Sequence, residues 1–384
     1  MLRRNFVSKL GSALPVAAVA AVGLPRVARA DDLPTFEGRL ANSSNRAQGA
    51  ALVGFLQNSL AQPGLTAVGR TVFSKLTEVI SVRDFGARGD GSDTTGQTDG
   101  PAIAAALAYA ASTRNGVQSG GIVYLPAGVY RINNPLVVGD YVQLVGDGGA
   151  TQIEPGTSFP SSSATCMISM GADGGNVFGT RIVDLYLTQR NDSSSFSPAL
   201  SKGVIFSNSM NELCGVFNVT INEVNGTDGI HFELGAGTHG PAMVEVNNVA
   251  MFARGSARNG ISCNVGSMIL KVSHLCLSGN SFLRGILMSS DILCADSVHL
   301  EECQVGIDFA TNSWGGKVSV LTASGLGPAS PCVVGIDSTF HKGTVNLENL
   351  VCFDATTATM ILNSANGFQS PSNSVVGTYS YSAP

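Results

Sequence analysis

A polar residue stands directly before a recurring glycine at four places in the second half of the sequence. Each of these glycines is followed by Val or Ile, and at two later copies the preceding residue is valine. In a strand that begins at Gly229, side-chain alternation points Ile230 and Phe232 inward and His231 and Glu233 outward. The pattern predicts one groove lined by ionisable side chains. The four polar residues before glycine are Lys202, Asp228, Asn259 and Arg284.

These side chains have the composition that a polysaccharide lyase requires. Such an enzyme needs a cation to neutralise the substrate carboxylate and a base to remove the adjacent proton. Arg284 and Lys202 are the candidate cations, and His231 is the candidate base. The catalytic candidates are therefore Asp228, His231 and Arg284, and the substrate-binding candidates are Lys202, Glu233 and Asn259. The alternative is a solvated ladder of local ion pairs without catalytic function.

A second pair of carboxylates follows the last two glycine repeats. Asp308 and Asp337 each come two residues after a repeat glycine. If their strands stack directly, the two backbones lie about 5 Å apart. That places the carboxylates near the separation expected for a retaining glycosidase, and they form the alternative catalytic pair. The competing interpretation is two exposed side chains that point apart.

A repeated six-residue block indicates which elements position these residues. Seven copies with alternating apolar residues begin at intervals of 23 to 34 residues, and the glycine block follows most of them. Two short strands per repeat predict a coil of a solenoid, whose apolar face is buried only when coils stack. The repeat therefore predicts an all-β protein, a β-helix from about residue 79 to near 370. The copies begin at Ile182, Val216, Val246, Val272, Ala295, Val318 and Leu347.

One position inside this block is polar in four copies. It holds Asp184, Asn218, Asn248 and His274. We interpret it as a buried polar ladder or a turn bond, and not as a catalytic position. Ahead of the repeat, the alanine-rich segment 101–114 begins with Pro101 and predicts a helix that caps the first open coil.

The segments 82–91, 122–131 and 144–148, with the alanine-rich helix between them, resemble the start of pectate-lyase-like superfamily domains. The resemblance implies a right-handed single-stranded parallel β-helix, the fold of polysaccharide lyases, glycoside hydrolases and phage tailspikes. Residues 49–54 and 67–78 are similar to the linker that precedes the β-helix in tailspike-like proteins. The resemblance also implies a polysaccharide as the partner and a homotrimer as a candidate assembly.

The polygalacturonase-like members supply a test of hydrolysis. Residues 225–230 resemble their first catalytic motif, with one extra residue before Asp228. Their second motif needs paired Asp where this chain has Arg258 and Asn259, and their third needs His where it has Leu283 and Arg284. A polygalacturonase mechanism is therefore disfavoured.

The first thirty residues have the three parts of an export signal. Arg3 and Arg4 precede an apolar run, and Ala28 and Ala30 form a cleavage site. The paired arginines favour a twin-arginine signal over an ordinary secretory signal. We expect cleavage after Ala30 and export to the periplasm or the medium. The expected organisation is a signal peptide at 1–30, a linker at 31–78 and a β-helix domain at 79–384.

Composition excludes several other classes. The net charge is −5, and no basic run follows residue 30, so we expect no nucleic-acid partner. No later stretch is apolar enough for a membrane span.

Eight cysteines without a C-x-x-C motif favour buried free thiols over a metal site, with disulfides as the alternative. We expect no cofactor, except a calcium ion if the chain is a lyase. Trp314 is the single tryptophan, which disfavours a sugar site built on tryptophan platforms.

The combined prediction is an exported carbohydrate-active β-helix protein. It would cleave or bind an acidic or cell-surface polysaccharide, as a lyase or a glycoside hydrolase. The alternative is a non-catalytic glycan-binding or structural β-helix related to tailspikes. The residues leave open whether the chain is an enzyme.

Overall fold

The computed structural model describes residues 78–324, apart from short gaps, and six strands outside this range. The chain divides into two compact units, 1–78 and 79–384. In the first unit, β1 (Gly54–Leu56) pairs antiparallel with β2 (Gly69–Thr71). The signal peptide and its cleavage site lie outside the described residues, so export stays a prediction. The gaps are at 115–116, 119, 163, 173–174, 236–239, 267, 280–281, 290 and 311–312.

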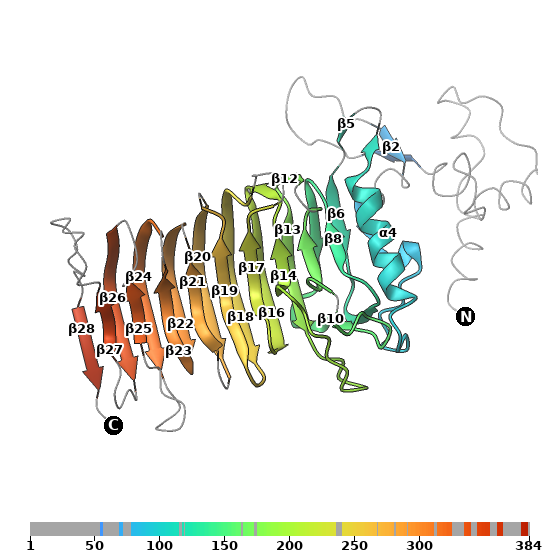
Figure 1. The fold of residues 1–384 in the computed structure, drawn as a ribbon. Coiled ribbons are helices and arrows are strands. Elements are labelled where there is room, and N and C mark those ends of the chain that lie inside the picture. Colours follow the sequence, from blue (N-terminus) through green and yellow to red (C-terminus); the bar gives the residue numbers. More distant parts are fainter. Residues whose placement is uncertain are drawn as a thin grey trace, which may run out of the picture. The chain divides into compact units, whose positions relative to one another are not determined.

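The second unit is built from two long parallel sheets that run the length of the coil stack (Figure 1). The first, which we call the broad sheet, consists of longer strands. Two further strands, β7 (Gly128–Ile132) and β10 (Thr151–Pro155), pair in parallel, and β10 also pairs with β13. The path of the broad sheet is β3 (Val79–Ser81), β6 (Gly121–Tyr124), β9 (Val142–Val145), β13 (Arg181–Thr188), β16 (Cys214–Val224), β18 (Met243–Ala253), β20 (Ile269–Ser278), β22 (Ile292–Glu301), β24 (Gly315–Ser324), β26 (Thr344–Phe353) and β28 (Thr378–Ser382).

The second sheet, which we call the narrow sheet, contains the strands that begin near the repeated glycine. Its strands alternate along the chain with those of the broad sheet, so each turn of chain adds one strand to each sheet. This confirms the parallel β-helix, and the parallel crossovers have the usual right-handed sense. The narrow sheet is β8 (Leu136–Val138), β11 (Ile168–Met170), β14 (Gly203–Ser207), β17 (Asp228–Glu233), β19 (Ala257–Asn264), β21 (Phe282–Met288), β23 (Cys303–Phe309), β25 (Val334–Ser338) and β27 (Thr359–Asn363).

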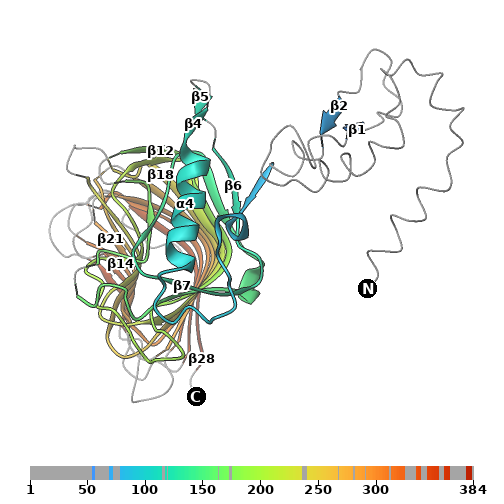
Figure 2. The ribbon, with the colours of Figure 1, turned by 90° about the vertical axis from the view of Figure 1, so that its right-hand side faces the viewer.

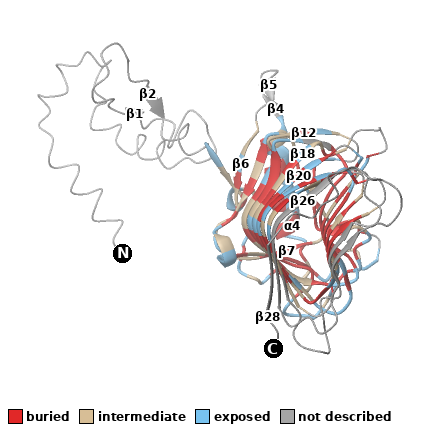
Figure 3. Cartoon of the chain, turned by 90° about the vertical axis from the view of Figure 1, so that its left-hand side faces the viewer, coloured by how far each residue is buried: buried red, intermediate tan, exposed pale blue. Residues whose placement is uncertain are grey.

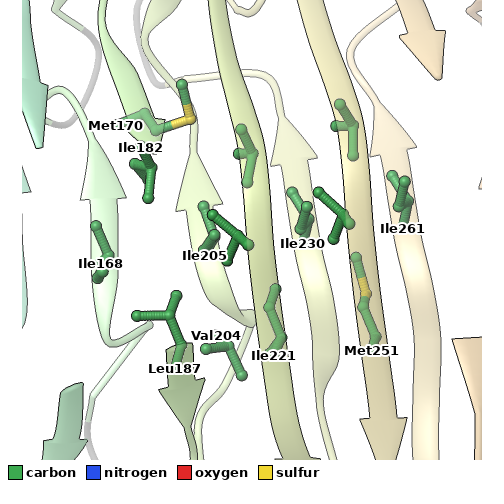
Figure 4. Close-up of a cluster of buried hydrophobic side chains, with 14 of the residues drawn as sticks. Ile168, Met170, Ile182, Leu187, Val204, Ile205, Ile221, Ile230, Met251 and Ile261 are labelled. Carbon is green, nitrogen blue, oxygen red and sulfur yellow. The ribbon is translucent and has the colours of Figure 1, made fainter. Parts of the chain in front are cut away.

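The core lies between the two sheets and consists of rows of like residues. Ile168, Ile205, Ile230 and Ile261 are register partners in consecutive strands, and all are fully buried. Figure 4 shows them facing side chains of the broad sheet such as Met251. Figure 3 shows the same arrangement, with buried residues toward the interior and exposed residues outside. Truncation of one such isoleucine to alanine typically costs about 2–5 kcal/mol.

The polar row at 184, 218, 248 and 274 marks a bend in the broad sheet. All four residues have φ between 53° and 54°, a left-handed conformation that Asp and Asn tolerate best. Asn218 Nδ2 donates to Asp184 Oδ1 at 2.9 Å, and Asn248 Nδ2 donates to Asn218 Oδ1 at 2.9 Å. These bonds join neighbouring coils, so the expected polar ladder is present and not a turn bond, but the ladder is not buried, because three of its four residues are exposed.

The helix α4 (Asp99–Ala111) packs on the first coils through Ile103, Ala106 and Leu107, which are buried. Figure 2 shows it lying across β7 and beside β6. It begins earlier than Pro101, because Asp93 Oδ2 accepts hydrogen bonds from the backbone N–H groups of the residues that open the helix. It ends before residue 114, because β4 (Thr113–Arg114) turns back to pair with β5 (Val117–Gln118). The remaining short elements are η5 (Val82–Phe85), η6 (Gly148–Ala150), β12 (Asn176–Phe178) and β15 (Met210–Glu212).

The six cysteines in the described part of the chain are free thiols. Burial raises the pKa of Cys166 to about 12 and that of Cys214 to about 11. The expectation of buried thiols is wrong for Cys294, which is exposed, and for Cys276, which is half-buried, because both positions alternate outward on the broad sheet. Cys332 and Cys352 lie outside the residues whose side chains are described.

None of the described helices is long and apolar enough to cross a membrane.

Candidate active site

The strand β17 presents its polar residues outward, as the alternation predicts. Ile230 and Phe232 are fully buried, and the side chain of His231 is 13% exposed on the outer face. His231 Nδ1 lies 2.6 Å from Asp228 Oδ2, and His231 Nε2 lies 3.3 Å from Glu233 Oε2. The imidazole therefore lies between two carboxylates of its own strand.

Asp228 is the fixed member of this group. It is 2% exposed, and its Oδ1 accepts hydrogen bonds from the Asn259 backbone N–H at 3.1 Å and from Asn259 Nδ2 at 2.9 Å. Arg258 Nε is 3.5 Å from the same oxygen. An ionised carboxylate only accepts hydrogen bonds, so Asp228 Oδ2 accepts one from the Nδ1–H of His231 and fixes the orientation of the ring. Nε2 is then the ring nitrogen that remains for contact with a substrate.

Lys202 joins the group from the neighbouring strand. The glycine pattern aligns it with Asp228, but the structure pairs Gly203 with Asp228, so this alignment is wrong by one residue. Lys202 therefore lies one residue before the paired part of β14. Its ammonium nonetheless reaches Glu233 Oε2, at 2.5 Å, and its side chain is 38% exposed. Glu233 thus holds both Lys202 and His231 Nε2.

A hollow of about 360 Å³ opens beside this group, over β8, β11, β14 and β17. Phe206 forms part of its wall and stacks on His231, with ring centroids 6.0 Å apart and planes inclined by 25°. Sequence reasoning missed this hollow and missed Phe206, because alternation counted from Gly203 points Phe206 inward, whereas the structure pairs Phe206 with the outward His231. The hollow is lined by Pro135, Thr165, Cys166, Ser169, Lys202, Phe206, Asn208 and Glu233.

Arg284 does not meet this group through any described contact. It is the register partner of Asn259, as expected, but its Nε lies 2.5 Å from Asp308 Oδ2 in the following strand. Asp308 is in turn the register partner of Asp337, so the direct stacking predicted for this pair is confirmed. The side chain of Asp337 is not among those described. The Asp308 carboxylate is paired with Arg284, so it could contact a substrate only if this ion pair opened.

Within the described part of the chain, no three His, Cys, Asp or Glu side chains converge as a metal site. The donor set around His231 contains an ammonium group, which a divalent cation would have to displace from Glu233. The residues present therefore do not fit a calcium ion at this place.

The fold and the repeat place the chain in a known class of β-helix proteins. The family model described as rhamnogalacturonase A/epimerase, pectate lyase-like, matches residues 79–337, and the chain belongs to this family.

Individual relatives are more distant. Over 86 residues the chain is 44% identical to mannuronan C5-epimerase AlgE1 of Azotobacter vinelandii. This aligned segment covers 20% of this chain and 5% of that protein. A tailspike protein of E. coli bacteriophage HK620, solved in complex with a pentasaccharide, is similar in fold with a TM-score of 0.54 and 15% identity, over 86% of this chain and 66% of that one. The A-module of mannuronan C-5 epimerase AlgE4 of Azotobacter vinelandii is 20% identical, with a TM-score of 0.39, over 75% and 89% of the two chains. The chain thus spans a small part of its curated relative and about two thirds of the tailspike.

Proposed function

We propose that the chain acts on an acidic polysaccharide by removing the proton next to a uronate carboxylate. Lyases and C5-epimerases share this step, and they differ only in the fate of the enolate that it forms. The observation that carries the proposal is the imidazole of His231, fixed through Nδ1 on the buried Asp228 and lying beside a lysine that lines a hollow. The family of the chain and the saccharide named for its tailspike neighbour support a polysaccharide substrate.

The first step assigns a role to each charged group. The uronate carboxylate takes the place of Glu233 on the Lys202 ammonium, which offsets the charge that develops as the enolate forms. His231 Nε2 then accepts the proton from the α-carbon, and the electrons of the broken C–H bond move onto the carboxylate. Asp228 stabilises the resulting imidazolium through the hydrogen bond to Nδ1. Lys202 and His231 act on the substrate directly, whereas Asp228 positions His231.

The second step decides between two products. If the glycosidic oxygen at the β-carbon leaves with the electron pair, the product is an unsaturated uronate and the chain is a lyase. If a water molecule instead delivers a proton to the opposite face of the α-carbon, the enolate electrons form the new C–H bond and the product is the epimer.

Hydrolysis is the weaker interpretation of this geometry. A glycosidase needs two carboxyl groups that face the scissile bond. Asp228 is almost fully buried and already accepts hydrogen bonds from Asn259 and His231, so it does not face a substrate. Asp308 is bound to Arg284. We therefore favour a reaction that begins with proton abstraction over hydrolysis.

The hollow also gives the proposed direction of the substrate. It extends from Lys202 and Glu233 over β14, β11 and β8, toward the N-terminal coils. We propose that the sugar chain occupies these coils. A contribution from Arg284 and Asn259, on the C-terminal side of His231, stays a prediction.

A non-catalytic glycan-binding β-helix is the second candidate. It is favoured by one observation, namely that Lys202, Glu233, His231 and Asp228 contact one another in a continuous chain. Export, a homotrimer and calcium remain expectations from the sequence.

The test is a screen of the purified protein on uronate polymers. Ultraviolet absorbance reports unsaturated ends, proton NMR of the polymer reports epimerisation, and a reducing-sugar assay reports hydrolysis. The proposal expects unsaturated ends or epimers. Reducing ends without either product would point to a hydrolase, and binding without any product would point to the second candidate.

A further inference from the structure

The outer face of the broad sheet carries two adjoining hollows that lie apart from the Asp228 group. One, of about 140 Å³, is lined by Arg181, Phe217, Met243, Glu245 and Lys271 among others. The other, of about 290 Å³, shares Lys271. Its polar lining residues are Lys271, Ser273, Cys294, Asp296, Lys317 and Ser319.

The cations in these hollows belong to one row of the sheet. Register pairs connect Arg181 through Gly215 to Glu245, then Glu245 to Lys271, Lys271 to Cys294 and Cys294 to Lys317. Adjacent strands are about 4.8 Å apart, so Lys271 and Lys317 are about 10 Å apart at the backbone. The row therefore presents positive charge at multiples of the coil spacing, over a distance that spans several sugar rings.

The charge of this row contrasts with that of the whole chain. The two hollows are lined by three cations and two carboxylates, a balance of 3 − 2 = +1. The chain carries −5 in total, and two of its six lysines stand in this row. Lys271 Nζ is 3.0 Å from Glu245 Oε1, but the two side chains are 57% and 30% exposed. An ion pair this exposed is worth little, so a ligand carboxylate can replace Glu245 at small cost.

We propose that this row is a second binding site, without catalysis, for an anionic polysaccharide. Lys271 and Lys317 would bind carboxylates of the chain, and the side chains of Ser273 and Ser319 lie in the same hollow for contact with hydroxyl groups. Met243, which is 48% exposed, and Phe217 offer apolar surface to a sugar ring. Arg181 lies over the Phe217 ring, 5.5 Å from its centroid, which holds the guanidinium at the edge of the smaller hollow.

The site differs from the first one in chemistry. Among the described residues that line the two hollows there is no histidine, and no group there resembles the buried Asp228 with its imidazole. The row therefore has the cations for binding and lacks a positioned base. This inference does not depend on the proposed reaction, because a glycan-binding protein could use the row equally well.

The experiment compares two double variants of the full chain by calorimetric titration with a long oligomannuronate. Both are made in a Lys202→Gln background, so that the first site neither binds normally nor converts the probe. Lys271→Gln with Lys317→Gln removes the proposed site. Arg88→Gln with Arg254→Gln removes the same charge from exposed side chains elsewhere and serves as the control.

The expected result is residual binding in the background protein that weakens about ten-fold in the lysine double variant and stays unchanged in the control. The residual affinity should also fall as salt rises. In a protein with Lys202 intact, the lysine double variant should keep full turnover of short oligouronates, which separates this site from the proposed reaction. Equal binding by all three proteins would overturn the inference, and so would competition by an oligonucleotide at the same concentration as the uronate.

Discussion

The outer faces of the two sheets present hollows that look alike in composition and differ in one feature. Each contains a lysine paired with a glutamate, Lys202 with Glu233 on the narrow sheet and Lys271 with Glu245 on the broad sheet. Each also contains a cysteine. Only the narrow sheet adds His231, an imidazole fixed by a buried carboxylate.

The difference separates binding from chemistry. The exposed Lys271–Glu245 pair exchanges readily for the carboxylate of a ligand. The half-buried Lys202–Glu233 pair also offers an ammonium group to an acidic polymer, beside its hollow. Proton abstraction needs a base whose orientation is set before the substrate arrives, and Asp228 supplies this on the narrow sheet alone. We therefore assign turnover to one face and simple binding to the other.

The largest expected effect comes from removing the base. His231→Gln should lower turnover of a uronate polymer by about 10²–10⁴-fold, the usual contribution of a general base, with little change in thermal stability. The matched control is His299→Gln on the broad sheet, where Nε2 lies 2.8 Å from Glu301 Oε1 without a buried Asp partner. Rates measured side by side should fall for the first variant only. Equal losses would contradict the assignment of turnover to one face.

The two cysteines give the next contrast. Burial raises the pKa of Cys166 to about 12, whereas Cys294 is exposed in its hollow. Alkylation by iodoacetamide at pH 8 should therefore modify Cys294 at least about 10²-fold faster than Cys166, because the thiolate is the reactive form. Peptide mass spectrometry over a time course measures both rates. Comparable rates would show that the floor of the first hollow opens to solvent.

A smaller effect is expected from the residue that positions the base. Asp228→Asn keeps the shape and the contact with Asn259 but loses the charge that stabilises the imidazolium. We expect kcat to fall about 10–100-fold while KM changes little, since Asp228 does not touch the substrate. Steady-state kinetics on short oligouronates give both values. A large rise in KM with unchanged kcat would instead make Asp228 a substrate-binding residue.

The sequence predicted the fold well because a solenoid repeats its signal. The alternation recurs from coil to coil, so the outward direction of His231 follows from period two, but β14 is buried at every position and Ile205 joins the isoleucine row only through its register. The contacts of the site were harder to predict, because they depend on which coils adjoin. The repeat does not predict that Lys202 lies one residue out of alignment with Asp228. Nor does it predict that Arg284 forms an ion pair with Asp308, because this depends on the reach of the side chains. The hollow beside Phe206 is formed by residues from several neighbouring coils and has no local sequence pattern.

The smallest effect tests the bend of the broad sheet, at His274, which lines neither hollow of that sheet. His274 has φ of 53°, in the row where the preceding coils have hydrogen-bonded Asn. His274→Asn should raise the free energy of unfolding by about 0.5–1 kcal/mol, because Asn tolerates the left-handed conformation and extends the amide ladder. Thermal denaturation against wild type measures it. A loss of stability would mean that the imidazole makes a contact that outweighs the backbone preference.

The central claim is that His231 removes a proton next to a uronate carboxylate. Its most direct test is incubation of a uronate polymer with the protein in deuterium oxide, followed by NMR of the carbon that carries the carboxylate. The account predicts loss of the proton signal at that carbon, by deuterium incorporation or by formation of a double bond, with wild type and with His299→Gln but not with His231→Gln. Cleavage of the polymer with that proton fully retained would contradict it.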